Sequence, residues 1–323
     1  MAKECGVSLR RSSLSLLAAV ALATTAGCSF SLGTSDPPAD GGGTGTIASS
    51  SPSADNASVS PQVLEDSVVF LMTTVTGYVL YPGGENGEYV WSDEVTAVGS
   101  CTGWMAGEGR EIMTAGHCVD QDEGRSALIS TFLSDYDVTE EERVDAEINW
   151  TVEGLKDGSE IEVQVMTKQP NIDGATISDW IPVQVVDVLP FEKGDLALLR
   201  ANGLRPDSQP PVMNVADEDP QTGDSVTSIG FPAAVADVSN TMSIQNPSFK
   251  TGTISSKQIS PRGVAGYEIN ADISAGMSGG PTVNEAGKVV GVNSYTIRGE
   301  SQAFNFITDT ADLRRFLEKN GVG

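Results

Sequence analysis

The sequence predicts an all-β protein built from short strands joined by turns. The chain contains 35 glycines and 16 prolines, which interrupt helices and favour turns. Between them lie many short runs rich in valine, isoleucine and threonine, residue types that fit the half-buried surface of a sheet. Several runs alternate apolar and polar residues, which is the pattern of a strand with one buried face. With 323 residues, the chain is long enough for more than one packed core.

The charge of the chain is strongly negative. It has 44 acidic and 19 basic residues, for a formal net charge of −25. Nucleic acids and anionic membranes bind clustered positive charge, so neither is expected as a direct partner. We interpret the excess of carboxylates as a solvated surface that keeps an exported protein soluble.

Residues 1–27 are predicted to be an export signal. Basic residues precede a short apolar stretch, and small residues lie before Cys28, as in a cleaved signal peptide. The apolar stretch is too short to cross a bilayer as a helix. The run Thr-Ala-Gly-Cys that ends at Cys28 resembles a bacterial lipobox, which implies acylation of Cys28 and a lipid anchor in the cell membrane. Thr25 departs from the leucine usual there, so an ordinary signal peptide and a secreted protein remain the alternative.

Residues 28–61 are predicted to form a flexible tether, and residues 62–323 the folded domain. The tether consists almost entirely of small, polar and proline residues. Such a segment cannot bury enough apolar surface to offset the entropy cost of ordering it.

The first half of the domain contains a series of predicted strands. The first covers Ser67 to Tyr81 and stops at the turn-forming run Pro82-Gly83-Gly84. Two more strands flank the turn at 107–109, and two alternating segments lead toward Asp195. The predicted strands after the first are Val95 to Ala106, Glu111 to Thr114, Ile161 to Met166 and Ile181 to Leu189.

The segment from Asp122 to Glu147 is expected to be an irregular, acidic surface insertion. It could select substrates or hold a cation, but its carboxylates lack the spacing of a calcium-binding loop. We therefore interpret it as a solvated loop.

The second half repeats the pattern of short strands and turns, and then ends in a helix. Leu313, Phe316 and Leu317 fall on one face of a helix predicted over Thr310 to Lys319, and Gly321 offers a stop signal. The predicted strands before it are Ser225 to Pro232, Thr251 to Ser255, Tyr267 to Asn270, Lys288 to Tyr295 and Phe304 to Ile307.

Three motifs carry residue types suited to nucleophilic catalysis. His117, the single histidine of the chain, lies in the run Thr-Ala-Gly-His-Cys. Asp195 opens an apolar run that reads as a strand, and Ser278 lies in Gly-Met-Ser-Gly-Gly-Pro. A serine among glycines leaves its hydroxyl uncrowded, and it allows the N–H groups of Gly276 and Ser278 to point at one oxyanion. Taken singly, each residue also fits an ordinary structural role.

The three residues occur along the chain in the order His117, Asp195 and Ser278, and in this order the sequence resembles the trypsin-like (chymotrypsin-fold) serine peptidases. Among these, it is most similar to bacterial HtrA-like peptidases without a PDZ domain. The resemblance covers about residues 62 to 320. It implies two six-stranded antiparallel β-barrels, a short C-terminal helix and a cleft between the barrels. Within it, Ser278 is the nucleophile, His117 the base and Asp195 the residue that orients His117.

The resemblance implies further roles for neighbouring residues. Ser294 matches a serine that hydrogen-bonds the triad aspartate, and Cys101 and Cys118 match a disulfide of the fold. In an exported protein, two cysteines left after processing are most simply a disulfide, and too few ligands are present for a metal site. Met277 replaces the aspartate that trypsin-like zymogens carry, so activation by a newly cut N-terminus is not expected.

The specificity pocket is assigned to Asp272, Ser294, Tyr295 and Thr296. Asp272 lies six residues before Ser278, the spacing at which trypsin carries its pocket-floor aspartate, and this predicts a preference for arginine or lysine. HtrA-like peptidases carry an aspartate two residues earlier, where this chain has Asn270, and have an apolar pocket. The length of the loop that leads to Ser278 decides between a preference for arginine or lysine and an apolar pocket.

The sequence thus predicts an exported serine endopeptidase that acts on polypeptides and needs no metal or other cofactor. A catalytically silent peptide-binding module on the same fold is the alternative, and an esterase using the same triad is another.

Overall fold

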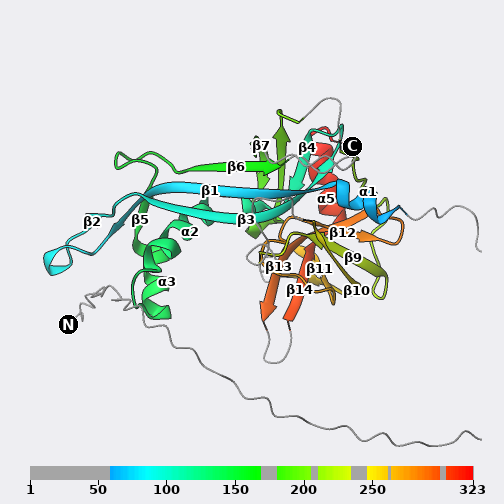
Figure 1. Ribbon diagram of the computed structural model, residues 1–323. Coiled ribbons are helices and arrows are strands. Elements are labelled where there is room, and N and C mark those ends of the chain that lie inside the picture. Colours follow the sequence, from blue (N-terminus) through cyan, green and yellow to red (C-terminus); the bar gives the residue numbers. More distant parts are fainter. Residues whose placement is uncertain are drawn as a thin grey trace, which may run out of the picture.

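The computed structural model describes residues 59–168, 180–204, 210–233, 246–260, 263–298 and 303–322. The predicted export signal, Cys28 and nearly all of the tether lie outside the described residues. Figure 1 shows strands gathered into two adjoining bodies, with a separate helical part on the far side of the first. In the described ranges, no helix is both long and apolar enough to cross a membrane.

The first body is a closed barrel of six antiparallel strands. Strand β1 pairs with β3 on one edge and with β6 on the other, and these pairings close the ring. Buried side chains such as Leu71, Trp104 and Leu198 fill its interior. In ring order the strands are β1 (Val68–Tyr81), β3 (Val95–Ala106), β4 (Glu111–Thr114), β8 (Leu196–Ala201), β7 (Trp180–Leu189) and β6 (Glu162–Lys168).

The second body is also a closed barrel of six antiparallel strands. Its interior holds Val226, Ile254, Tyr267 and Ile307, all buried. In ring order the strands are β10 (Ser248–Ile259), β11 (Ala265–Ile269), β14 (Ala303–Thr308), β13 (Val289–Arg298), β12 (Pro281–Asn284) and β9 (Ser225–Gly230). The prediction of two six-stranded antiparallel barrels is confirmed.

Helix α5 (Thr310–Lys319) is the expected C-terminal helix. Asp309 caps its start by accepting hydrogen bonds from the N–H groups of Ala311 and Asp312. Its apolar face, with Leu313 and Phe316, joins a core that also contains residues of both barrels. The helix therefore helps hold the two barrels together.

The expectation of an irregular loop from Asp122 to Glu147 is wrong. The segment forms helices α2 (Gln121–Leu133) and α3 (Glu140–Asn149). Asp120 caps α2, and Thr139 forms a capping box with Glu142 at the start of α3. The prediction failed because the two segments contain many acidic residues and few apolar ones, so the apolar face of each helix is difficult to recognise in the sequence.

The apolar face of α2 and α3 packs on the outer part of β1. Ile129, Leu133, Ala146 and Trp150 are buried together with Val79 of β1. The outer end of β1 pairs with two short strands that the sequence did not predict, β2 (Val90–Trp91) and β5 (Thr151–Glu153). We call α2, α3, β2, β5 and the outer ends of β1 and β3 the helical lobe; it projects from the first barrel (Figure 1).

Short helices complete the described part. Helix α1 (Pro61–Asp66) precedes β1, and η1 (Glu85–Gly87) precedes β2. The segment η2 (Gly116–Cys118) follows β4, and η3 (Phe191–Lys193) precedes β8. The segment η2 contains His117, and η3 lies shortly before Asp195.

Candidate active site

His117 lies in η2, directly after β4 and before α2. A Cβ atom at the preceding Gly116 would lie 2.3 Å from the carbonyl oxygen of Leu189, so only glycine fits there. The His117 side chain remains 25% exposed. This position holds the imidazole at the surface of the first barrel.

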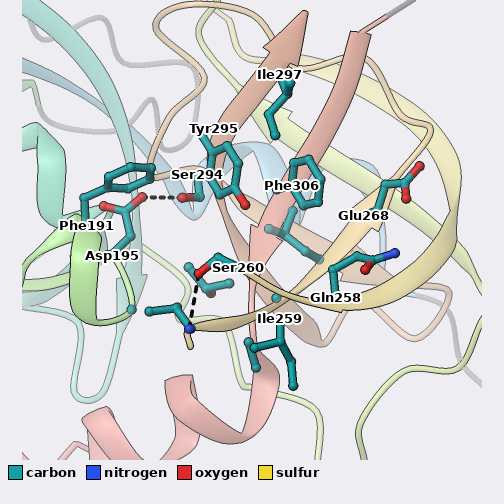
Figure 2. A pocket seen from close by; sticks show the side chains of 16 residues that line it. Phe191, Asp195, Gln258, Ile259, Ser260, Glu268, Ser294, Tyr295, Ile297 and Phe306 are labelled. Atoms are coloured by element: carbon teal, nitrogen blue, oxygen red, sulfur yellow. Dashed lines mark hydrogen bonds between the residues drawn. The ribbon is translucent and has the colours of Figure 1, made fainter. Parts of the chain in front are cut away.

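Asp195 lies at the start of β8 and is almost completely buried, at 3% exposure. Its carboxylate accepts a hydrogen bond from the backbone N–H of His117 (2.9 Å) and lies 2.9 Å from Nδ1 of the His117 ring. The hydroxyl of Ser294 donates to the same carboxylate (Figure 2). Asp195 has a φ of +58°, in the left-handed region that aspartate tolerates better than most residues.

The contacts shift the pKa values of both groups. Burial by itself raises the pKa of Asp195, but the hydrogen bonds and charge of His117 and the hydrogen bond from Ser294 outweigh burial and hold the pKa below its ordinary value. Burial lowers the pKa of His117, and Asp195 and the charge of Glu123 more than offset this effect. The imidazole is therefore more basic than a free histidine side chain.

Ser278 lies in the loop between β11 and β12, which is fixed to both barrels. The carbonyl of Ser278 accepts a hydrogen bond from the N–H of Thr102 in β3 (2.8 Å), and the N–H of Gly279 donates to the carbonyl of Asn293 in β13 (2.8 Å). Gly279 has a φ of +83°, and a Cβ atom there would lie 2.0 Å from Oγ1 of Thr114. The glycine after the serine thus permits close contact with the first barrel.

The N–H groups of Gly276 and Ser278 donate no hydrogen bond to any described residue, whereas the N–H of Met277 between them donates to the carbonyl of Ser274 (3.0 Å). The carbonyl of Gly276 accepts a hydrogen bond from Oγ1 of Thr102 (2.7 Å), which fixes the orientation of the loop. The N–H group of Ser278 itself and that of Gly276, two residues before it, are thus available as a pair of donors, which is what an oxyanion requires.

No hydrogen bond joins the Ser278 hydroxyl to His117 in the described structure. The hydroxyl donates a long hydrogen bond, 3.5 Å, to the carbonyl of Ser294. Hydrogen bonds between a serine hydroxyl and an imidazole in a candidate site are commonly long without a bound ligand and tighten only when one binds.

Ser294 and Tyr295 line a cavity of about 230 Å³ beside Asp195 (Figure 2). The other two residues assigned to the specificity pocket do not line it. Thr296 is exposed and donates a hydrogen bond to Oδ1 of Asn305 (2.8 Å), and Asp272 is also exposed. The remaining lining combines apolar side chains, including Phe191, Ile259, Ile297 and Phe306, with the polar side chains of Asp195, Gln258, Ser260, Glu268 and Thr308.

Two residues that shape the candidate site were not identified from the sequence. The Phe191 ring meets His117 and Tyr295 edge-on, with ring centroids 6.3 Å and 5.3 Å apart. Thr102 positions the Ser278 loop from β3. Both residues lie in ordinary strand or turn sequence, and only the packing of distant segments gives them these roles.

Cys101 and Cys118 form a disulfide that joins β3 to the residue after His117. Cys101, His117 and Cys118 together have the ligand types of a metal site, but both sulfur atoms are bound to each other and offer no thiolate.

Replacing both Cys101 and Cys118 by alanine is expected to lower the free energy of unfolding by about 3 kcal/mol, because the bridge closes a chain loop with a sequence separation of 17. Urea unfolding followed by tryptophan fluorescence measures this change. Cys28→Ser, which removes a cysteine outside the described residues, is the control and should leave the unfolding midpoint unchanged. An unchanged midpoint in the double variant would show that the bridge adds no stability.

Comparison with known proteins identifies a matching family and a similar solved structure. The family described as trypsin-like peptidase domain matches residues 101–292, which is more than half of the chain. No curated protein matches the sequence. Among solved structures, the active form of the Rv3671c protease from M. tuberculosis matches with 19% identity and a TM-score of 0.47, over 81% of this chain and 84% of that one.

Proposed function

Because the chain belongs to the family of trypsin-like peptidase domains, we propose that it is a serine endopeptidase whose catalytic residues are His117, Asp195 and Ser278. The observation that carries the proposal is the buried Asp195 carboxylate, which is held by the backbone N–H and Nδ1 of His117 and by the hydroxyl of Ser294. Such an arrangement fixes the imidazole in one tautomer and one orientation.

In this mechanism, His117 accepts the hydroxyl proton of Ser278 as the oxygen attacks the peptide carbonyl carbon. Asp195 holds the proton-bearing Nδ1 of His117, which leaves Nε2 to act as the base, and it stabilises the imidazolium that forms. The N–H groups of Gly276 and Ser278 bind the oxyanion. His117 then gives the proton to the leaving amine, and a water molecule hydrolyses the acyl-enzyme by the same steps.

The cavity lined by Ser294 and Tyr295 supports a substrate with apolar character on the acyl side of the scissile bond. Its walls include Phe191, Ile297 and Phe306 (Figure 2). The exposed Asp272 lies outside this cavity, so a preference for arginine or lysine before the scissile bond rests on its spacing from Ser278 alone.

We also infer that the enzyme acts outside the cytoplasm. Residues 1–27 would be removed as the export signal, Cys28 would carry the lipid anchor, and residues 28–61 would tether the domain that begins at residue 62. Polypeptides are then the expected partners, and the membrane is contacted only through the lipid.

A fluorophosphonate probe tests the proposal, because it reacts only with an activated serine. The full-length protein is expected to be labelled at Ser278. Because His117 must be neutral to act as base and its pKa is raised above 6.5, the labelling rate should fall about tenfold per pH unit below that raised pKa. Labelling rates between pH 5 and 9, measured by in-gel fluorescence, check both statements.

The control for this experiment is protein unfolded in urea, which should not react. Folded, disulfide-bonded protein that fails to react at any pH would contradict the proposal. The peptide-binding module without catalysis would then be the better explanation. Labelling without cleavage of any polypeptide would instead favour an esterase.

A further inference from the structure

Asn293 is completely buried next to the loop that carries Ser278. It lies in β13, and its backbone is bound to this loop twice. Its carbonyl accepts a hydrogen bond from the N–H of Gly279 (2.8 Å), and its N–H donates to the carbonyl of Gly280 (2.8 Å). A buried amide side chain costs free energy unless its polar atoms are hydrogen-bonded. The contacts of the side chain therefore indicate why a polar residue lies at this position.

The Asn293 side chain uses both ends of its amide. Nδ2 donates hydrogen bonds to the carbonyls of Ile229 in β9 (3.3 Å) and Met277 (3.2 Å). Oδ1 accepts a hydrogen bond from the hydroxyl of Thr282 in β12 (2.7 Å), and Oγ of Ser228 in β9 lies 2.6 Å from that hydroxyl. Because carbonyl oxygens only accept, the end of the amide that faces Ile229 and Met277 must be the NH2 group. A buried row of polar side chains thus ends on the Met277 carbonyl.

The direction of the Met277 carbonyl determines where the N–H of Ser278 points. The two groups belong to one peptide unit, which is planar and trans, so they point in opposite directions. With the carbonyl bound to the amide of Asn293, the N–H of Ser278 points away from that amide, and it has no acceptor among the described residues. Turning the peptide over would place two donors face to face and leave the buried amide without this acceptor, which is unfavourable.

A second contact on the same carbonyl comes from the loop itself. The N–H of Gly280 donates to the Met277 carbonyl (3.1 Å), which closes a turn around Ser278. A Cβ atom at Gly280 would lie 2.1 Å from the carbonyl oxygen of Ile229, the other oxygen that Asn293 binds. The glycine therefore lets the turn lie close enough to β9 for one amide to reach both carbonyls. Asn293 thus fixes the turn to the second barrel, which the hydrogen bond within the turn cannot do.

The peptide unit that bears the other oxyanion donor, the N–H of Gly276, is held by a different group. The N–H of Ala233 donates to the carbonyl of Ala275 (2.8 Å), and this carbonyl shares one planar unit with the N–H of Gly276. Asn293 makes no contact with that unit among the described hydrogen bonds. Loss of the Asn293 amide is therefore expected to disturb one of the two donors and to leave the other in place.

We propose that Asn293 is a positioning residue, whose buried amide binds the Met277 carbonyl and so holds the N–H of Ser278 in the direction that an oxyanion requires before substrate arrives. The inference rests on the endopeptidase function proposed above. In this role Asn293 acts only through the peptide unit that it binds. Its loss should therefore weaken stabilisation of the transition state and leave binding of the intact substrate unchanged.

The first test replaces Asn293 by leucine in the full-length protein, which keeps the approximate shape and removes the amide. Loss of an oxyanion donor costs roughly 10²–10³-fold in kcat, and loss of its positioning should cost a part of this, about 30-fold, with KM unchanged. Affinity for a peptide aldehyde, whose serine adduct resembles the tetrahedral intermediate, should fall by a similar factor. Ser228→Ala removes a buried hydroxyl of the same row without touching the Met277 carbonyl. It is the matched control and should keep both values.

A milder pair of variants tests the same inference without removing the amide. Thr282→Val deletes the hydroxyl that binds Oδ1 of Asn293, so the amide is held less firmly. We expect kcat to fall about fivefold, in keeping with the loss of one buried hydrogen bond, again with KM unchanged. Thr282→Ser keeps the hydroxyl and should retain the wild-type kcat. Thermal unfolding of every variant shows which proteins are folded, so that kcat is compared only among these.

Wild-type kcat in folded Asn293→Leu and Thr282→Val, or a raised KM with kcat unchanged, would overturn the inference. If the wild type cleaves no peptide and reacts with no fluorophosphonate, it is the endopeptidase function that fails. Asn293 is then judged by amide hydrogen exchange at Gly280, whose N–H donates to the same Met277 carbonyl. Faster exchange in Asn293→Leu or Thr282→Val than in Ser228→Ala supports the hold on this peptide unit, and equal exchange rules it out.

Discussion

Ser278→Ala is expected to lower kcat/KM for peptide hydrolysis by about 10⁶-fold, because no other group can form the acyl-enzyme and the proposed triad acts as one unit. The fold should remain, since the contacts that hold the loop are made by backbone groups of Ser278 and Gly279. Gel electrophoresis of an unfolded protein substrate during digestion measures the activity. Thermal unfolding of each variant measures whether the fold is kept.

Ser274→Ala is the matched control for this variant. Ser274 is an exposed serine in the same loop, and it contributes to the described structure through its backbone carbonyl. It should keep activity close to that of the wild type. Comparable activity in Ser278→Ala and wild type would remove Ser278 from the mechanism and leave another residue, or a contaminating enzyme, as the source of hydrolysis.

Asp195→Asn is expected to lower kcat by about 10⁴-fold, the size of effect known for loss of the triad aspartate. An asparagine amide that donates to Nδ1 forces the proton of His117 onto Nε2, so the imidazole can no longer accept the proton of Ser278. The change also removes the negative charge that raises the pKa of His117. The acidic limb of any remaining activity should therefore move to lower pH.

The measurement is kcat as a function of pH on one peptide substrate. Asp187→Asn is the control: Asp187 pairs with Lys319 at the protein surface, so its loss should leave the pH profile unchanged. A loss of activity in Asp195→Asn with an unshifted acidic limb would indicate that Asp195 supports the local fold and does not tune His117.

The strands were predictable because their signals are local. The stretches from Val95 to Ala106 and from Glu111 to Thr114 coincide with β3 and β4, and the terminal helix begins and ends where its apolar spacing placed it. The helical lobe was not predictable. Helices α2 and α3 are rich in acidic residues, and their few apolar side chains become a recognisable face only against Val79 and Trp150.

For the candidate site too, some features could be predicted from the sequence and others could not. The order of His117, Asp195 and Ser278 and the glycines around the serine could be read from the sequence, and their assignment as a catalytic triad stays a prediction. The contact between Ser294 and Asp195 spans 99 residues of sequence, and it was expected only through the family resemblance. The roles of Phe191 and Thr102 had no signal of any kind, because each depends on segments that meet only in the folded chain.

By itself, then, the sequence determined which segments extend, where they turn and which residue types capable of acyl transfer are present. These properties follow from alternation, turn chemistry and motif, all of which act over a few neighbouring residues. Only the tertiary structure decided that Asp272 lies outside the described cavity, that the Ser278 hydroxyl points to Ser294, and that β3 pairs with β4 only from Trp104 to Ala106. The physical reason is that strand register and helix packing pair residues far apart in sequence. Such pairings, made between whole elements, decide which backbone and charged groups remain accessible at the surface.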